Sequence, residues 1–516
     1  MPNLFTILKT SLIAFLIYLI LTKNIMSRIL DLPNLLFNNS SIDNKSRNFD
    51  PNYKSRLKIA LDAGGYPGGI ANDGNTCFMN SIFQSLASST LFIDFLIKNS
   101  SNSPFSNEIL SLLNSINSLN QNKSQTFTTK KLLKLMKDSP NKHLFLGYNQ
   151  EDAQEFYQNL MKQVEKEFKD QKKIEKSNDY IELPENALQG IESIGELGNV
   201  YVPVNHIDPA DSINANKFKP FTLLTPVDGI QCDRIGCIEC GEMGGIRYSI
   251  TSGLALNLPS NYVTRKEFSL HDLIDEFCKQ ETIENVECNR CSLITMREAI
   301  LEKIENLNNS ASASPLLVSK FNEKLKLINE TLALRSIPDK IYNNLHTKNL
   351  VQKSTKVKQS LLSRPPPLLC IHINRSVFDP NTYMVRKNNA KINFPLLFDA
   401  SPYIADDNNI NLDPREPLRA SNNQLPIYYS LKSVVSHFGT HNYGHYIAYR
   451  KHNGFWWHIS DETVTLSSEN EVLNSQGTFM LFYEFDPNPI EENIDQPPLS
   501  STSSNDEVLA NIQANL

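Results

Sequence analysis

The sequence predicts an α+β fold, because helical patterns fill its first half and strand patterns its last third. Apolar residues recur at helical spacing in three segments, Thr76–Leu86, Glu151–Lys166 and Leu270–Cys278. Short apolar runs typical of buried strands come later, at Leu368–Ile373, Ile427–Val435, Tyr446–Tyr449 and Thr478–Tyr483. Helices followed by strands, without regular alternation, are typical of α+β proteins. The composition, 40% hydrophobic and 21% charged, is that of a globular protein.

The charge balance and the cysteine count exclude several classes of protein. The 516 residues include 50 Lys and Arg against 56 Asp and Glu, a net charge of −6. A mildly acidic chain without a long basic run is a poor nucleic-acid binder and suits a positively charged partner. Eight cysteines are too few for a disulfide scaffold in a chain of this length.

The N-terminal segment Leu4–Leu21 is the first feature that departs from a globular pattern. Its only charged residue is Lys9, and as a helix it spans about 27 Å, close to the thickness of a bilayer core. No small-residue cleavage pattern follows it, which favours an uncleaved signal-anchor over a cleaved signal peptide. A buried core helix fits less well, because the second half is apolar on every side. We predict one transmembrane helix within residues 1–28.

Basic residues after this segment predict its orientation. Lys23 and Arg28 follow closely and further basic residues lie beyond them, so the positive-inside bias places the body of the protein in the cytosol. A short, moderately hydrophobic span with basic C-terminal flanks is typical of a mitochondrial outer-membrane anchor. The endoplasmic reticulum is the alternative.

Composition divides the rest of the chain into three parts. We expect a linker at 29–65, a globular domain at 66–485 and a disordered acidic tail at 486–516. Three stretches of the globular domain are expected as insertions, near 99–125, 166–219 and 302–358. The third contains an amphipathic stretch, Leu316–Leu334, expected to be helical. It is either a partner-binding element or solvated filler.

Cys77 lies where a glycine- and Asn-rich turn runs into a helical pattern, in GGIANDGNTCFMNSIFQSL (68–86). A cysteine at a helix N-terminus meets unpaired N–H groups and the positive end of the helix dipole, which we expect to lower its pKa. The turn also offers polar donors, among them Asn72. A buried structural cysteine is the alternative, and the flanking loop favours a nucleophile.

A thiolate nucleophile needs a base, and His445 is the candidate among ten histidines. It stands in YGHYIAYR at the start of a strand pattern. Asp461 follows sixteen residues later, in WWHISDETV, at the end of what reads as the next strand. A hairpin can bring the two strand ends together, so that the carboxylate reaches the second imidazole nitrogen.

Two CxxC pairs, Cys237/Cys240 and Cys288/Cys291, predict a zinc site. Each pair offers two thiolates to one tetrahedral ion. Between the inner cysteines, Cys240 and Cys288, lie 47 residues, so the spacing alone leaves the site open. Cys232 is an alternative ligand.

Five blocks in order resemble the ubiquitin-specific protease family of deubiquitinases. The segment around Cys77 looks like its cysteine box, and YSLKSVVSHFGTHNYGHYIAYR with WWHISDETV looks like its histidine box. Between them, QEDAQEF (150–156), PPPLLCIHINR (365–375) and KINFP (391–395) resemble three further blocks. One departure is that Ser376 follows Arg375 where the family usually has an aromatic residue.

The resemblance implies a papain-like cysteine peptidase fold with thumb, palm and zinc-ribbon fingers, preceded here by the transmembrane helix. Cys77 then matches the nucleophile, His445 the general base and Asp461 the residue that orients the base. Asn72 matches the donor to the oxyanion. Residues expected to meet substrate are Asp152, which matches a contact to the ubiquitin tail, Gln150, and Tyr446 beside the histidine. One structural zinc ion in the fingers is implied, held by Cys237, Cys240, Cys288 and Cys291, with no catalytic cofactor.

The implied activity is thiol-dependent hydrolysis of the isopeptide bond at ubiquitin's C-terminal glycine, on conjugates at a membrane surface. The expected partners are ubiquitin, ubiquitinated proteins and the membrane, and no nucleic acid is expected. A catalytically silent, membrane-tethered ubiquitin-binding scaffold is the alternative; it would lack Cys77, His445 or Asp461, and none is missing. A secreted thiol protease would use its cysteines in disulfides.

Overall fold

The computed structural model describes residues 52–136, 152–172, 180–185, 187–188, 193–259, 265–309, 314–379, 383–405, 409–420, 425–440 and 443–489. The chain divides into two compact units, Met1–Gly64 and Gly65–Leu516. The predicted anchor at 1–28 and nearly all of the predicted tail lie outside the described residues. Within the described ranges, no helix has both the length and the apolar character to cross a bilayer.

The first unit contains helix α3, Tyr53–Asp62, inside the segment predicted as a linker. Its sequence, YKSRLKIALD, holds Leu, Lys, Arg and Ala and neither Gly nor Pro. These residues have high helix propensity, which explains a helix in a segment whose polar composition suggested none.

Five helices of the second unit form the thumb: α4 (Cys77–Leu86), α5 (Thr90–Asn99), α6 (Pro104–Asn117), α7 (Lys130–Met136) and α8 (Ala153–Lys172). Every residue of α4 is buried, so this helix lies at the centre of the fold. Phe156 of α8 meets Phe78 and Phe83 edge-on, with ring centroids 5.6 Å apart in both pairs. The nucleophile candidate therefore stands on a rigid helix.

The segment near 99–125, predicted as an insertion, contributes helix α6 to the thumb core. Ile109, Leu113 and Ile116 of this helix are fully buried and belong to the same cluster as α4 and α8. The Ser and Asn residues that suggested an insertion mostly occupy the outer face of an amphipathic helix.

The palm is a mixed sheet with the path β19-β18-β17-β16-β20-β11-β7, and β15 pairs with β16. Its strands are β7 (Leu254–Asn257), β11 (Leu368–Asn374), β15 (Leu397–Asp399), β16 (Tyr428–Gly439), β17 (Gly444–His452), β18 (Phe455–Ser460), β19 (Thr463–Ser467) and β20 (Thr478–Phe485). All neighbours on this path are antiparallel except β11 and β7. The four late apolar runs predicted as strands are confirmed.

A buried arginine joins the palm to the thumb. Arg450 of β17 is fully buried and donates to Asn117 Oδ1 (2.7 Å) and to Ile116 O (2.9 Å) at the C-terminus of α6. A cation is favourable at this end of a helix, where the last carbonyls lack intrahelical donors. Burial lowers the pKa of Arg450 to about 9. This contact holds the strand that carries His445 against the thumb helices.

The fingers are a four-stranded sheet with the order β6-β5-β10-β9. Its strands are β5 (Gly229–Cys237), β6 (Met243–Thr251), β9 (Glu281–Glu287) and β10 (Lys353–Arg364). Hairpin β3 (Gly198–Pro203) and β4 (Phe218–Leu223), with short helix α9 (Val204–Ile207), adds Val200 and Val202 to the core formed by Ile230 and Ile246. The β3–β4 hairpin lies at the end of the predicted 166–219 insertion.

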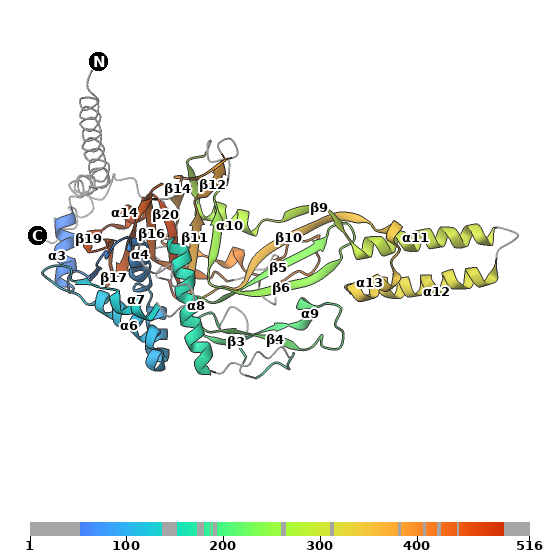
Figure 1. The fold of residues 1–516 in the computed structure, drawn as a ribbon, viewed down its shortest axis with the longest axis horizontal. Helices are drawn as coiled ribbons and strands as arrows, with labels where there is room; N and C mark the ends of the chain where they lie inside the picture. The colour runs from blue at the N-terminus through green and yellow to red at the C-terminus, as the bar shows by residue number, and fades with distance from the viewer. Residues whose placement is uncertain are drawn as a thin grey trace, which may run out of the picture. The chain divides into compact units, whose positions relative to one another are not determined.

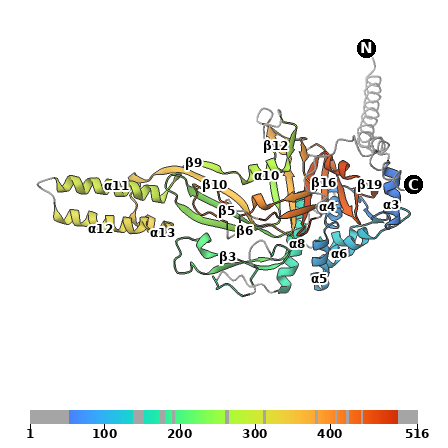
Figure 2. The same ribbon diagram turned by 180° about the vertical axis from the view of Figure 1, so that it is seen from behind.

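Helices α11 (Asn289–Asn308) and α12 (Pro315–Leu332) lie side by side in both views, followed by α13 (Asp339–Leu345) (Figures 1 and 2). The helix predicted at Leu316–Leu334 is confirmed as α12. Leu293, Met296 and Ile300 of α11 pack with Ile328 of α12 and Tyr342 of α13 in a core separate from those of thumb and palm. The third predicted insertion, as far as it is described, is thus a packed helical element.

The remaining described α-helices and strands are short. They are β1 (Gly69–Ile70), β2 (Thr126–Phe127), β8 (Glu267–Ser269), α10 (Leu270–Cys278), β12 (Ser376–Asp379), β13 (Met384–Lys387), β14 (Lys391–Asn393) and α14 (Glu469–Leu473). Short pairs form between β1 and β2, β8 and β14, and β12 and β13. The predicted helix Leu270–Cys278 is confirmed as α10. Its capping box between Ser269 and Asp272 explains where it begins.

Candidate active site

Cys77 is the first residue of α4, as the sequence predicts. The loop before it is held by Asn72, whose Oδ1 accepts hydrogen bonds from Thr76 N (3.1 Å) and Thr76 Oγ1 (3.2 Å). Thr76 also begins the first turn of α4, since its carbonyl oxygen accepts a hydrogen bond from Asn80 N. These bonds fix the loop that presents Cys77 at the helix N-terminus.

The Cys77 thiol is buried against strand β17. Burial raises the pKa of this thiol to about 11, and the negative charge of Asp461 acts in the same direction. Hydrogen bonds from the backbone N–H groups of Tyr446 and Phe78 lower the pKa but do not outweigh burial. The expected fall in pKa at a helix N-terminus is therefore wrong for the ligand-free protein, because the cost of desolvating the thiolate is larger.

His445 lies near the start of β17, where it pairs with Phe438 of β16. Its Nε2 lies 2.8 Å from Ser460 Oγ, a hydrogen-bond distance. Asp461 Oδ2 lies 3.9 Å from the same nitrogen. The hairpin of β17 and β18 thus brings His445 and Asp461 together as predicted. It places Ser460 closer to the imidazole than Asp461.

Asp461 lies in the turn after β18 and connects the palm to the cysteine loop. Its backbone is in the left-handed region, with φ 51°, which Asp adopts more readily than most residues. Its Oδ2 accepts from Asn72 Nδ2 (2.9 Å) and its Oδ1 from Asn80 Nδ2 (2.7 Å). Its carbonyl accepts from Ile70 N (3.0 Å).

The two chain segments also meet backbone to backbone. A Cβ at Gly69 would lie 2.8 Å from Asp461 O and 2.9 Å from Glu462 Cα, so only glycine fits there without movement. Glu462 Oε1 accepts from Asn72 N (2.7 Å). The loop before Cys77 and the turn after β18 therefore form one interlocked structure, although they lie nearly 390 residues apart in the sequence.

A negative charge on the Asp461 carboxyl group costs free energy in this buried position. Burial raises the pKa of its carboxyl group above the usual value. The hydrogen bond from Asn80, the nearby His445 and the hydrogen bond from Asn72 lower the pKa in part. Asn80 and Asn72 therefore stabilise the ionised form of this carboxyl group.

The predicted substrate contacts occupy different surroundings. Asp152 is exposed, and its Oδ1 accepts from Gln154 N (2.7 Å) and Glu155 N (3.1 Å), so it caps helix α8. Tyr446 is 7% exposed and stacks on His437, with ring centroids 4.4 Å apart. Packing is thus its main role in this structure, and little of its surface is left for a direct contact with substrate. Gln150 lies outside the described residues.

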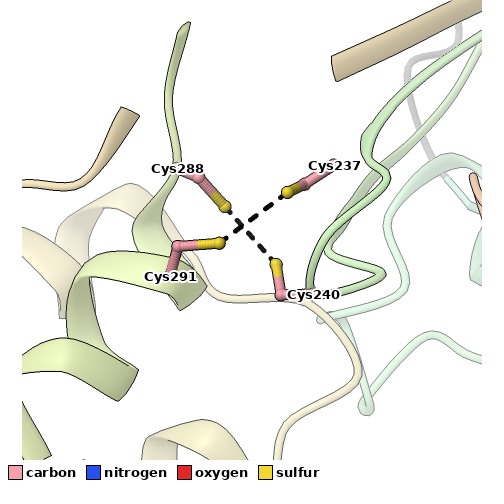
Figure 3. A group of neighbouring side chains, drawn as sticks. All are labelled: Cys237, Cys240, Cys288 and Cys291. Atoms are coloured by element: carbon pink, nitrogen blue, oxygen red, sulfur yellow. Dashed lines mark hydrogen bonds between the residues drawn. The ribbon is translucent and has the colours of Figure 1, made fainter. Parts of the chain in front are cut away.

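Four cysteines form a second site, at the junction of the fingers and helix α11. Cys237 ends β5, Cys240 lies in the following turn, Cys288 precedes α11 and Cys291 lies in its first turn. Their Sγ atoms all lie within 4.8 Å of one another and point toward a common centre (Figure 3). The Sγ–Sγ distance is 3.5 Å between Cys240 and Cys288 and 3.8 Å between Cys237 and Cys291. Four sulfurs converging in this way fit a tetrahedral metal ion.

Cys232, the alternative ligand, is not part of this group. It is buried in the middle of β5, with its Sγ 3.5 Å from Leu361 O. The turn that carries Cys240 is also tied to helix α11. Arg290, between Cys288 and Cys291, forms an ion pair with Glu242.

Comparison with known proteins decides the family. The family model described as "Ubiquitin carboxyl-terminal hydrolase" matches residues 68–483. The chain belongs to this family. It is 32% identical to ubiquitin carboxyl-terminal hydrolase 1 of Saccharomyces cerevisiae, with 83% of this chain and 80% of the yeast protein aligned. It is 24% identical to ubiquitin carboxyl-terminal hydrolase 27 of Arabidopsis thaliana, with coverages of 81% and 85%.

A solved structure agrees with this fold. The chain is similar to a chain of the SAGA Ubp8/Sgf11/Sus1/Sgf73 DUB module bound to ubiquitin aldehyde, with a TM-score of 0.50 and 20% identity. The match covers 81% of this chain and 69% of that one. The second unit therefore has the catalytic fold of ubiquitin-specific proteases, as the sequence predicts, and the protein is a cysteine-type deubiquitinase.

Sequence reasoning missed two residues of this deubiquitinase site, Ser460 and Asn80. Ser460 directly precedes the predicted Asp461, and nothing in its pattern separates it from an ordinary strand end. Asn80 offered a signal, because it is a polar residue in the apolar run CFMNSIFQSL three positions after Cys77. A buried asparagine in a helix needs a partner, and the partner here is Asp461.

Proposed function

We propose that this deubiquitinase hydrolyses the isopeptide bond after the C-terminal glycine of ubiquitin, with Cys77 as the nucleophile and His445 as the base, at a membrane surface. The observation that carries the proposal is the interlocked site in which α4 presents Cys77 beside the strand of His445, and Asp461 binds Asn72. The complex of a similar chain with ubiquitin aldehyde supports ubiquitin as the ligand.

In the proposed reaction, Cys77 Sγ attacks the carbonyl carbon of the terminal glycine while His445 accepts the thiol proton. Burial keeps the thiol of the free enzyme protonated, so proton transfer to His445 accompanies the attack. His445 then gives the proton to the leaving lysine amine as the C–N bond breaks. Water next attacks the thioester with His445 as base, releasing ubiquitin and restoring the thiol.

Asn72 is the proposed donor to the oxyanion. Its amide nitrogen carries two hydrogens, and one of them is directed to Asp461 Oδ2 at 2.9 Å. That bond fixes the orientation of the amide, which leaves the second N–H to donate to the negative oxygen that develops on the attacked carbonyl. Asp461 thus acts on the oxyanion indirectly, because it orients the amide of Asn72.

Asp152, which is exposed, is proposed to contact the basic C-terminal tail of ubiquitin, and Gln150 is proposed to contact it as well. Asp152 Oδ1 is used in capping α8, so its outer oxygen Oδ2 would make the contact. Asp152→Asn keeps a side-chain oxygen for the cap and removes the charge. We therefore expect it to raise KM with little change in kcat.

One zinc ion per chain is proposed at Cys237, Cys240, Cys288 and Cys291. Four thiolates satisfy a tetrahedral ion and leave no position for water, so the ion would be structural. The thiols of Cys240 and Cys288 share a hydrogen bond, which lowers the pKa of Cys288 and raises that of Cys240. Metal analysis of the purified protein should return one zinc per chain.

Membrane anchoring through Leu4–Leu21 remains a proposal from sequence alone, with the mitochondrial outer membrane favoured over the endoplasmic reticulum. Protease added to intact organelles should degrade the catalytic domain, since we expect it in the cytosol. Removal of residues 1–25 should release an active enzyme. A protected, glycan-bearing domain would contradict this topology.

The central test uses ubiquitin that carries a thiol-reactive group at its C-terminus. We expect covalent labelling of Cys77, none in Cys77→Ala, and strong reduction in His445→Ala. Asn72→Ala should keep ubiquitin binding and lose about 10²–10³ in turnover, the usual effect of one oxyanion donor. Cys370→Ala is the matched control, because Cys370 is also a buried thiol but lies in β11. Labelling that persists in Cys77→Ala would exclude Cys77 as the nucleophile.

A further inference from the structure

The residue in hydrogen-bond contact with the His445 imidazole is Ser460. The Nε2–Oγ distance is 2.8 Å, whereas the distance from Nε2 to the nearer carboxylate oxygen of Asp461 is 3.9 Å. A nitrogen–oxygen separation of 3.9 Å is an electrostatic contact and too long for a hydrogen bond. Orientation of an imidazole ring and choice of its tautomer depend on the hydrogen bond to the second nitrogen.

The Asp461 carboxylate is directed toward other partners. Its Oδ1 accepts from Asn80 Nδ2 at 2.7 Å, and its Oδ2 accepts from Asn72 Nδ2 at 2.9 Å. Both donors belong to the segment around Cys77. Asp461 therefore binds the segment that carries Cys77, whereas Ser460 contacts the imidazole of His445.

Sheet register explains why the serine reaches the imidazole. In the β17–β18 ladder Ala448 pairs with Ile459, so one step further along this register places Ser460 opposite Ile447. His445 is two residues from Ile447 and projects from the same face, which makes Ser460 its diagonal neighbour. Asp461 comes after the strand, where its left-handed backbone turns the chain away. The contact to Ser460 thus follows from regular strand geometry.

We propose that Ser460 is the positioning residue for the His445 base, and that Asp461 positions the oxyanion donor Asn72. This division of roles rests on the function proposed above for Cys77, His445 and Asn72. In the resting enzyme His445 Nε2–H donates to Ser460 Oγ, so Nδ1 carries the lone pair that accepts the thiol proton. After that transfer both ring nitrogens carry hydrogen, and Nδ1–H is returned to the leaving amine. Ser460 keeps its own hydroxyl proton throughout.

The test compares four full-length enzymes: the wild type, Ser460→Ala, Ser460→Thr and Asp461→Asn. Cleavage of a fluorogenic amide at the C-terminus of ubiquitin gives kcat and KM. NMR of protein labelled with ¹⁵N at histidine reports the His445 Nε2–H, which is observed when a hydrogen bond protects it from exchange with water. The thermal unfolding of each variant shows that it is folded at the assay temperature.

We expect Ser460→Ala to lose about 10- to 100-fold in kcat with KM nearly unchanged, the usual weight of one hydrogen bond to a group that becomes charged. Its Nε2–H signal should disappear. Ser460→Thr keeps the hydroxyl and should recover most of the turnover together with the signal. Asp461→Asn should also lose turnover, while its Nε2–H signal remains. Asp461 accepts from Asn72 and Asn80 through different oxygens, and asparagine has an NH₂ group, which cannot accept, in place of one of them.

The reverse pattern would overturn the proposal: Ser460→Ala with normal turnover and a preserved Nε2–H, and Asp461→Asn without the signal. Equal losses in Ser460→Ala and Ser460→Thr, with the signal kept in both, would also overturn it, because they would mark a merely structural residue. Failure of the proposed function is seen separately, as an absence of ubiquitin labelling at Cys77 in the wild type. The NMR comparison does not depend on turnover and still tests the Ser460 contact in that case.

Discussion

Substitution of Asn80 by alanine tests how the site keeps Asp461 ionised. Asn80 is 2% exposed, and its Nδ2 donates to Asp461 Oδ1 at 2.7 Å and to Ala71 O at 3.2 Å. Alanine is compatible with the helix and removes both bonds. The carboxylate then keeps its buried position and loses its shortest hydrogen bond.

The magnitude follows from the type of bond. A hydrogen bond to a charged group contributes about 1.5–3 kcal/mol, and we expect a loss of unfolding free energy in that range near neutral pH. Among the interactions that lower the pKa of Asp461, the bond from Asn80 is the largest. Its removal therefore raises this pKa further, beyond the increase that burial already causes.

The sign of the pH dependence is fixed by linkage. A carboxyl group whose pKa is higher in the folded state binds more protons there, so its contribution to stability falls as pH rises through its titration. The loss in Asn80→Ala should therefore be larger at neutral than at acidic pH. Protonated Asp461 is also a poorer acceptor for Asn72, so turnover should fail at a higher pH on the acidic side than in the wild type.

Two measurements check this: urea unfolding at several pH values and the pH profile of ubiquitin-amide hydrolysis. Gln84→Ala is the matched control, because Gln84 is 1% exposed on the same helix and its Nε2 donates to a neutral acceptor, Gly68 O, at 2.9 Å. We expect Gln84→Ala to lose stability without a shift in the acidic limb of the pH profile of turnover. An unmoved acidic limb in Asn80→Ala, or the same movement in Gln84→Ala, would refute the reasoning.

Three further predictions concern single residues. Arg290 donates to Leu332 O (2.7 Å) and Leu334 O (2.8 Å), so Arg290→Ala should make segment 314–335 cleavable by trypsin. Equal protection of this segment in variant and wild type would count against the prediction. With a pKa of about 11, Cys77 of the free enzyme should react with iodoacetamide at pH 8 about 100-fold more slowly than an unperturbed thiol. Arg450→Met should lose about 1–3 kcal/mol in denaturant unfolding, and an unchanged midpoint would mean that its two bonds contribute nothing.

The comparison of sequence with structure separates local from long-range information. The sequence by itself determined the positions of helices α4, α8, α10 and α12 and of the palm strands β11, β16, β17 and β20, because the spacing of apolar side chains along the chain reflects which face is buried. It also determined that Cys77 begins a helix. These features depend on residues a few positions apart. The segments around Cys77 and His445 could further be matched to a family as whole blocks.

Tertiary structure decided the quantities that depend on burial. The thiol pKa is the clearest case: the helix N-terminus acts locally and lowers it, but the packing of Cys77 against β17 raises it more. Packing also decided that α6, with its many Ser and Asn residues, belongs to the core. Neither result can be read from the local pattern, because burial depends on elements that lie far away in the sequence.

The partners of Asp461 and His445 were likewise decided only by the fold. Ser460 is the last residue of β18 and Asp461 follows it in the turn. This difference of one position places Ser460 rather than Asp461 at hydrogen-bond distance from the His445 imidazole. Asp461 instead meets Asn72 and Asn80, which precede it by 389 and 381 residues. The sequence named Cys77, His445, Asp461 and Asn72 but not Ser460 or Asn80. The contacts that bring these two into the site arise from the register of the sheet and from the docking of the cysteine loop against it.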